Sequence, residues 1–149
     1  MTAIHKATPE DAPRILPLMA SFHAEEGTEA DDAHRHNALM PLLDGSHLGE
    51  VFIIGPRIAP IGYVVITYGW SIEFGGKDAF VDEVYLRPKV RGRGLGSEVL
   101  LAVGRYLAEA QITAVHLEVD HDNTTAIAMY EKTGFQMRGR YGLMTRRLT

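Results

Sequence analysis

Residues 91–97, Arg-Gly-Arg-Gly-Leu-Gly-Ser, are the segment of this sequence whose residue types most clearly suggest chemistry. Glycines allow a backbone to approach a ligand closely. A strand is indicated before the segment, at 80–86, and a helix after it, where apolar residues recur at helical spacing from Leu95 to Leu107. A helix N-terminus offers free N–H groups and the positive end of a dipole, which both favour anions. We therefore expect a phosphate-bearing ligand at this junction.

Two common phosphate-binding motifs do not fit this loop. The dinucleotide fingerprint has glycines at its first, third and sixth positions, whereas the glycines here occupy 92, 94 and 96. The P-loop ends in Gly-Lys-Ser/Thr, and no lysine lies in this loop. A third pattern, Arg-x-x-Gly-x-Gly, is matched by Arg91, Gly94 and Gly96. A plain glycine-rich turn without a ligand is the alternative.

The segment 117–135 carries a second pattern: a strand, then Asn123, a helix that contains Tyr130, and Gly134-Phe135. Asn123 is a good helix N-cap residue. Tyr130 shares a helical face with Ala126 and Ile127, so its ring could simply pack in the core. The spacing alone therefore leaves both a packing role and a chemical role open for Tyr130.

The two segments together resemble the GNAT superfamily of acyl-CoA-dependent N-acyltransferases. The resemblance follows the element order of the whole chain and is most specific between residues 80 and 135. It implies that the loop amides hold the pyrophosphate of coenzyme A, that Asn123 contacts this cofactor, and that the Tyr130 hydroxyl lies near its sulfur. It also implies that the 80–86 strand splays from the 114–119 strand and pairs with the pantetheine arm. The cofactor-binding residues expected on this basis are Val84, Tyr85, Leu86, Arg91, Gly92, Arg93, Gly94, Leu95, Gly96, Ser97, Asn123, Ala126 and Tyr130.

Acetyl transfer to an amine makes three demands on such a site. The amine must lose a proton, because its pKa is about 10 and it is mostly charged at neutral pH. The carbonyl oxygen of the thioester needs a hydrogen-bond donor, which a backbone N–H of residues 84–86 could supply. The leaving thiolate needs a proton, for which Tyr130 is the candidate acid. No acyl-enzyme is required, which agrees with a chain without cysteine.

Asp82 and Glu83 are the candidate bases, with Asp82 preferred. Their side chains point to opposite faces of a regular strand, so only one can face the acetyl group unless a β-bulge redirects the pair. Each carboxylate could act through water or only attract a cationic amine. The alternative for each is a salt-bridged carboxylate at a strand end.

The acceptor side is less clearly marked. An acidic stretch could attract a cationic amine or could be an ordinary solvated loop. Aromatic residues on the third strand could line an acceptor pocket, form a dimer contact or pack in the core. His34 and His36 lie on different faces of a helix, so neither they nor His23 predict a metal site. The acidic residues are Glu25, Glu26, Glu29, Asp31 and Asp32, and the aromatic residues are Tyr68, Trp70 and Phe74.

The elements that must position these residues follow the order β-α-α-β-β-β-α-β-α-β-β, a mixed α+β domain. The last two strands are expected at 136–138 and 141–148, and a hairpin turn at 75–78. The resemblance implies a GNAT-like fold: a mostly antiparallel sheet of six to seven strands, with a splayed parallel pair and about four flanking helices. We expect residues 1–149 to form a single N-acetyltransferase domain.

Composition limits the remaining possibilities. The hydrophobic content is 46%, the charged content 23% and the formal net charge −4, which is ordinary for a globular domain and does not favour nucleic-acid binding. No signal peptide or membrane span is indicated, so we expect a cytoplasmic protein. The expected function is transfer of acetyl from acetyl-CoA to a small primary amine: a polyamine, an aminoglycoside-like compound or an amino-acid derivative. Acetylation of protein lysines or N-termini and a non-catalytic CoA-binding module are the alternatives, and a homodimer is left open.

Overall fold

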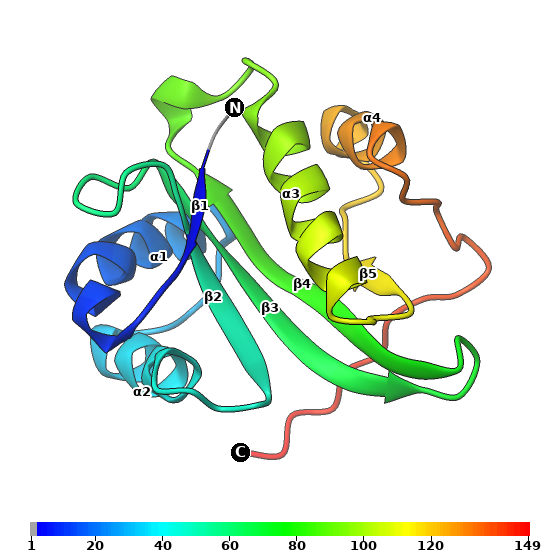
Figure 1. Cartoon of the computed structure of the whole chain (residues 1–149), viewed down its shortest axis with the longest axis horizontal. Helices are drawn as coiled ribbons and strands as arrows, with labels where there is room; N and C mark the ends of the chain where they lie inside the picture. The colour runs from blue at the N-terminus through cyan, green and yellow to red at the C-terminus, as the bar shows by residue number, and fades with distance from the viewer. Residues whose placement is uncertain (1–2) are drawn as a thin grey trace.

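A twisted mixed sheet runs through the computed structural model, which describes residues 3–149 (Figure 1). Within these residues the sheet has five strands in the order β1-β2-β3-β4-β5. The first four are antiparallel neighbours, and β5 pairs with β4 in parallel. The strands are β1 Ile4–Lys6, β2 Gly49–Ile54, β3 Gly62–Ser71, β4 Gly76–Leu86 and β5 Val115–Leu117.

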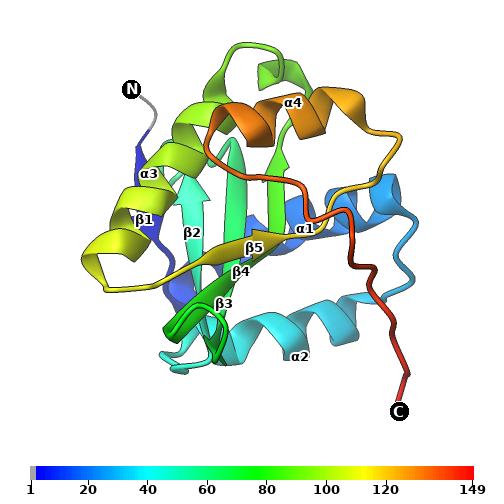
Figure 2. The same cartoon turned by 90° about the vertical axis from the view of Figure 1, so that its right-hand side faces the viewer.

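Helices cover both faces of the sheet, with α1 and α2 on one side and α3 and α4 on the other (Figures 1 and 2). Capping residues mark the junction of the first two helices: the Asp31 carboxylate accepts from the His34 N–H at 2.7 Å, and Gly27 ends the preceding helix with a φ of 71°. The helices are α1 Ala12–Glu26, α2 Asp32–Leu43, α3 Leu95–Glu109 and α4 Thr124–Lys132, with short 3-10 turns at Pro9–Asp11 and Pro88–Val90.

Two apolar clusters hold these layers together. Alternate residues of β3 point to opposite faces, so Tyr63 packs with α1 and α2 while Val64 packs with α3. Ile15 of α1 and Val99 of α3 are fully buried on the two sides. Each such side chain stabilises the fold by roughly 1.5–3 kcal/mol relative to an exposed one.

The expected fold class is confirmed, with a different strand count. The strands expected at 136–138 and 141–148 are wrong, because residues 136–149 form no strand and are exposed throughout. A strand needs a neighbouring backbone, and within this segment the backbone bond is a turn from the Tyr141 N–H to the Arg138 carbonyl at 3.0 Å. The hairpin turn also lies earlier than expected, at 72–75, where Gly75 supplies the left-handed conformation with a φ of 78°.

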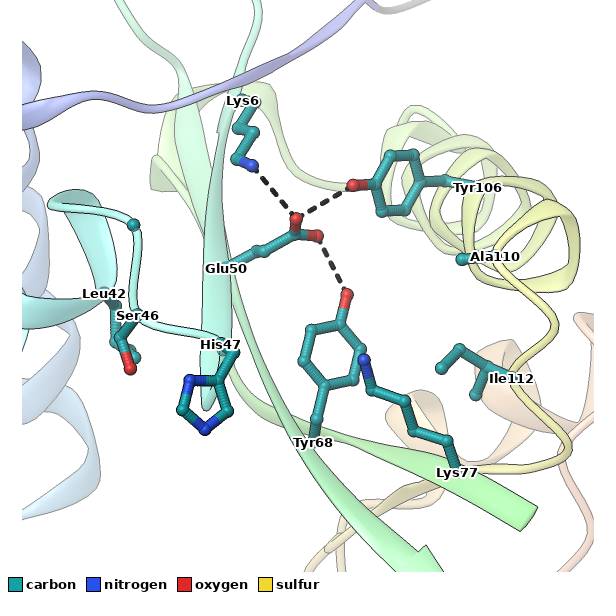
Figure 3. Close-up of a pocket in the computed structure, with 12 residues that line it drawn as sticks. Lys6, Leu42, Ser46, His47, Glu50, Tyr68, Lys77, Tyr106, Ala110 and Ile112 are labelled. Atoms are coloured by element: carbon teal, nitrogen blue, oxygen red, sulfur yellow. Dashed lines mark hydrogen bonds and ion pairs between the residues drawn. The ribbon is translucent and has the colours of Figure 1, made fainter.

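A half-buried carboxylate on β2 connects three strands of the sheet to α3 (Figure 3). Glu50 of β2 accepts from the hydroxyls of Tyr68 at 2.8 Å and Tyr106 at 2.9 Å, and pairs with Lys6 at 3.1 Å. Burial opposes ionisation, but these three donors outweigh it and lower the pKa of Glu50. Burial first, and the contact with Glu50 second, raise the pKa of Tyr106 to about 12. Glu50 therefore joins β1, β2, β3 and α3.

Glu50→Gln should lower the free energy of unfolding by about 1–3 kcal/mol at pH 7, because the uncharged amide is a weaker partner for all three donors. The folded-state pKa of Glu50 is depressed, so its contribution exists above the unfolded-state pKa and fades as pH falls through the folded-state value. Urea unfolding at pH 7 and pH 3 checks this. A difference between variant and wild type that stays constant with pH would contradict it, and Tyr106→Phe should give a smaller loss.

Candidate active site

A gap opens between β4 and β5 because their pairing is short. The two strands pair from Ala79 with Val115 to Val81 with Leu117, and β4 then continues to Leu86. On the β5 side, residues 82–86 have no strand partner in the described part of the chain. Their backbone groups can therefore hydrogen-bond to an extended ligand as a further strand would. The implied splay of this parallel pair is present.

A β-bulge lies where the two candidate bases sit. Val65 of β3 is opposite Glu83 and Ile66 is opposite Val81, so Asp82 is the extra residue. Val81 and Val84 both pack on the α3 side of the sheet. Asp82 and Glu83 both lie between Val81 and Val84, where a regular strand would have one residue. Both carboxylates are therefore directed towards the α1 side of the sheet. The expectation that the two side chains point to opposite faces therefore does not hold, and the alternative, a β-bulge that redirects the pair, does.

Glu83 is held by two side chains from other elements. His23 Nε2 of α1 lies 2.7 Å from one carboxylate oxygen, and the Tyr63 hydroxyl donates to the other at 2.8 Å. His23 is only 7% exposed, and its Nδ1 atom is buried with no hydrogen-bond partner within residues 3–149. Burial and the neighbouring Glu83 charge raise the pKa of Tyr63. This network fixes the Glu83 carboxylate in one orientation.

His23 and Tyr63 were not among the candidate residues found in the sequence. One signal was available: His23 continues the stripe of Ile15 and Met19 at helical spacing, on the buried face of α1. A histidine on such a face needs a polar partner, and here the partner is Glu83. The partner could not be read from the sequence, because it lies sixty residues away.

Asp82 has a different environment from Glu83. Its side chain makes no hydrogen bond or ion pair with the rest of residues 3–149, and it lies at the opening between β4 and β5. Partial burial and the charges of Glu83 and Glu118 raise the pKa of Asp82, although His23 opposes them. A carboxylate with a raised pKa and no competing partner is the stronger base.

The loop at 91–97 has the backbone expected of an anion site. Gly92 and Gly94 adopt left-handed φ values of 77° and 79°, and Gly94 is the N-cap of α3. The first turn of α3 has N–H groups that no intrahelical carbonyl can reach, and they point out of the helix end. The Arg91 guanidinium contacts both Glu25 carboxylate oxygens at 2.9 Å and donates to the Leu86 carbonyl at 2.9 Å. Arg91 thus braces the loop against α1 and β4.

Gly96 is needed for a different reason. A Cβ atom at this position would lie 2.7 Å from the sulfur of Met129 in α4, so Gly96 permits close contact between α3 and α4. A Cβ atom on Gly94 would meet open space, and only its positive φ resists substitution.

Gly94→Val should weaken acetyl-CoA binding by about tenfold or more, because a β-branched residue at a φ of 79° costs at least ~1–2 kcal/mol and turns the loop amides away. Gly104→Ala is the matched control: it lies in α3, its Cβ also meets open space, and its φ is not positive. Calorimetry with acetyl-CoA should show normal affinity for Gly104→Ala. Unchanged affinity in a folded Gly94→Val protein would show that the loop conformation does not hold the ligand.

Two of the residues expected to bind the cofactor belong to α4: Asn123 is its N-cap, and Tyr130 lies in its last turn. The Asn123 side-chain carbonyl caps α4 by accepting from the Ala126 N–H at 3.1 Å, which leaves its NH₂ group as a donor. Tyr130 is half-buried, with its ring 5.9 Å from Phe135 in an edge-on contact. Its hydroxyl has no hydrogen-bond partner in the described part of the chain. Burial, and then Glu26, raise the pKa of Tyr130, so the phenol stays protonated at neutral pH.

Other candidates from the acceptor side have structural partners. Tyr68 belongs to the Glu50 network, Asp31 caps α2, and Phe74 lies 5.5 Å from the ring of His116. Trp70 is 72% exposed. No group of three or more His, Asp or Glu side chains among residues 3–149 could hold a metal ion. Tyr68, Asp31 and Phe74 therefore have contacts that account for them without an acceptor, whereas Trp70 has none within the described chain.

A family model for the Acetyltransferase (GNAT) family matches residues 13–135. The chain belongs to this family. The match confirms the expected membership of the GNAT superfamily, a family that uses acetyl-CoA as its cosubstrate.

Individual relatives agree with this assignment. A mycothiol acetyltransferase from Nocardiopsis dassonvillei is 33% identical over 119 residues, which is 80% of this chain but 24% of that protein. Another from Rhodococcus opacus is 27% identical over 85% of this chain and 43% of the relative. The chain thus spans less than half the length of these two relatives. The crystal structure of an integron cassette protein from the mobile metagenome of Cole Harbour Salt Marsh is 29% identical and has a TM-score of 0.85. The structural match covers 98% of this chain and 90% of the cassette protein.

No helix in residues 3–149 is long and apolar enough to cross a membrane.

Proposed function

We propose that this chain is an acetyl-CoA-dependent N-acetyltransferase that acts directly on the primary amine of a small molecule in the cytoplasm. The observation that supports the proposal best is the opening between β4 and β5: Asp82 lies on β4 just beyond the last paired residue, and the glycine loop follows the end of β4. Family membership supplies the cosubstrate. The two sides of the opening then meet the separate demands of acetyl transfer.

The backbone of the opening provides binding and polarisation. The N–H groups at the start of α3 favour the pyrophosphate of acetyl-CoA. The unpaired edge of residues 84–86 suits its pantetheine arm, and an N–H of this edge would stabilise negative charge on the thioester oxygen. Val84, Tyr85 and Leu86 therefore contribute main-chain groups rather than side chains.

The side chains provide proton transfer. Asp82 would take a proton from the amine, directly or through water, because its pKa is raised and no protein group competes for it. Glu83, oriented by His23 and Tyr63, adds negative charge that makes Asp82 more basic. Tyr130 would protonate the departing thiolate. Both groups act while the reactants are held together, and no acyl-enzyme is needed.

The charge around the opening favours a cationic acceptor. Glu118 is close enough to Asp82, and Glu26 to Tyr130, to raise the pKa of each. A protonated amine would be attracted to this group of carboxylates. A polyamine, an aminoglycoside-like compound or an amino-acid derivative with a free amine fits that requirement.

Incubation with acetyl-CoA and a panel of small amines, scored by release of free thiol, tests this function. We expect release that depends on the amine and is fastest with a polycationic acceptor. Acetylation confined to a protein or peptide lysine or N-terminus would favour the protein-acetyltransferase alternative. Tight acetyl-CoA binding without turnover on any amine would favour a binding module.

A further inference from the structure

A small cavity lies between the loop that follows α2, the sheet and the C-terminal end of α3 (Figure 3). Its volume is about 290 Å³. Tyr68 and Tyr106, which line it, pack with the apolar cluster on the α3 side of the sheet. The candidate bases face α1 instead, and Lys77 of the cavity precedes Asp82 by five residues on β4, roughly 16 Å along a strand. The cavity is therefore separate from the opening between β4 and β5.

The carboxylate at the centre of the cavity is already matched by groups of the protein. Glu50 accepts hydrogen bonds from Tyr68 and Tyr106, and Lys6 supplies the opposite charge at 3.1 Å. These three contacts use both oxygens of the carboxylate. A cationic ligand would have to displace Lys6 to reach Glu50. The glutamate therefore does not mark a site for a cation.

The cavity instead offers a ligand N–H donors and positive charge. The Lys77 ammonium lies 4.3 Å from the centroid of the Tyr68 ring and makes no ion pair within residues 3–149. An ammonium has three N–H donors, so Lys6 also keeps donors beyond its contact with Glu50. Two lysines and one glutamate give the lining a charge of +1 with His47 neutral, whereas the whole chain carries −4. The unmatched groups of the cavity thus favour an oxyanion.

The size and the walls of the cavity favour an organic molecule over a bare ion. Its volume is at the lower end of the range of roughly 300–1,000 Å³ that is typical of small-molecule sites. Leu42 on the α2 side and Ile112 on the α3 side are partly buried apolar residues that line it (Figure 3). An apolar part of a ligand that left water to lie against these walls would gain free energy.

We propose that this cavity is a second binding site, for a small organic anion. Its carboxylate or phosphate group would accept hydrogen bonds from Lys77 and Lys6, and its apolar part would lie against Leu42 and Ile112. Charge-assisted hydrogen bonds would orient the ligand, while the apolar walls would discriminate against inorganic anions. The proposal concerns a site outside the opening and does not depend on acetyl transfer.

Calorimetry with four probes that share a phenyl ring tests the class of ligand. The probes are benzoate, phenyl phosphate, benzyl alcohol and benzylamine. A saturating amount of coenzyme A is present throughout, so that anion binding at the glycine loop is not counted. We expect saturable binding of benzoate and phenyl phosphate below about 10 mM, and at least tenfold weaker binding of the neutral alcohol. The anion that binds more tightly identifies the head group as carboxylate or phosphate.

Two variants of exposed residues assign the binding to the cavity. Lys77→Gln removes one charge and should raise the dissociation constant of both anions about tenfold. Ala110→Phe keeps the charge but fills the space, and should raise it tenfold or more; Ala110 has a φ of −83°, which any side chain tolerates. The matched controls are Lys132→Gln and Ala108→Phe, which change exposed residues outside the cavity lining and should bind the anions as wild type does.

Circular dichroism of the four variants should match that of wild type. If Ala110→Phe does not fold, the comparison of Lys77→Gln with Lys132→Gln still decides the outcome. The absence of saturable anion binding to wild type would overturn the proposal, and so would equal anion affinities in wild type, Lys77→Gln and Ala110→Phe. Benzylamine binding that is tighter than that of both anions and is lost in Ala110→Phe would make the cavity a cation site, which also overturns it.

Discussion

Tyr130→Phe should reduce turnover with acetyl-CoA and a good amine by about ten- to ten-thousand-fold, while acetyl-CoA affinity stays nearly constant. The substitution removes only the hydroxyl, and the ring can keep its edge-on contact with Phe135. The raised pKa of Tyr130 means that wild type holds the proton at the pH of the reaction. Steady-state kinetics with calorimetry on the same preparation measures both quantities.

A tyrosine elsewhere serves as the control for this substitution. Tyr141→Phe removes a hydroxyl from a residue that is 61% exposed, and turnover should be unchanged. If Tyr130→Phe instead lowers the melting temperature and keeps its turnover per folded molecule, then the packing role of Tyr130 is correct. The observed geometry allows both roles, because the ring is half-buried while the hydroxyl has no partner within residues 3–149.

Asp82→Asn should reduce turnover by about a hundred- to ten-thousand-fold near neutral pH and recover in part at high pH. The amide keeps the shape of the side chain but cannot take a proton. The amine, with a pKa of about 10, is already deprotonated at high pH and needs the base less. Rate–pH profiles of wild type and variant with one amine measure this difference. Equal profiles at every pH would remove Asp82 from the mechanism.

Glu83→Gln should have a smaller effect of a different kind. The Glu83 charge raises the pKa of Asp82, so its removal lowers that pKa. A base must be deprotonated to act, so the acidic limb of the rate–pH profile should move to lower pH. A large loss at all pH values, without such a shift, would make Glu83 itself the base. Because the bulge turns both carboxylates towards α1, this comparison decides between them.

Local patterns predicted the parts of the site that depend on neighbouring residues. The loop glycines at 92 and 94, the Asn123 cap and the helical face of Tyr130 were all visible in short stretches of sequence. The bulge at Asp82 was not, because it arises from the register between β3 and β4. The contact between His23 and Glu83 likewise depends on how α1 packs on the sheet.

The C-terminal segment shows that a local pattern can also predict strands that do not form. Residues 141–148 have β-branched, aromatic and alternating character in part, but a strand forms only when another backbone accepts its hydrogen bonds. Within the described chain that partner is missing, and the segment stays extended and exposed. Composition can indicate a tendency to form a strand, whereas the partner strand is a property of the tertiary or quaternary structure.

The most direct test of the central claim follows the acetyl group itself. Mass spectrometry of the amine after incubation with acetyl-CoA, run beside a free-thiol measurement in the same reaction, counts product and leaving group together. Direct transfer predicts one acetylated amine for each thiol released, with the mass of the protein unchanged. Thiol release that continues without amine, or acetyl groups that accumulate on the protein, would contradict direct transfer to a small amine.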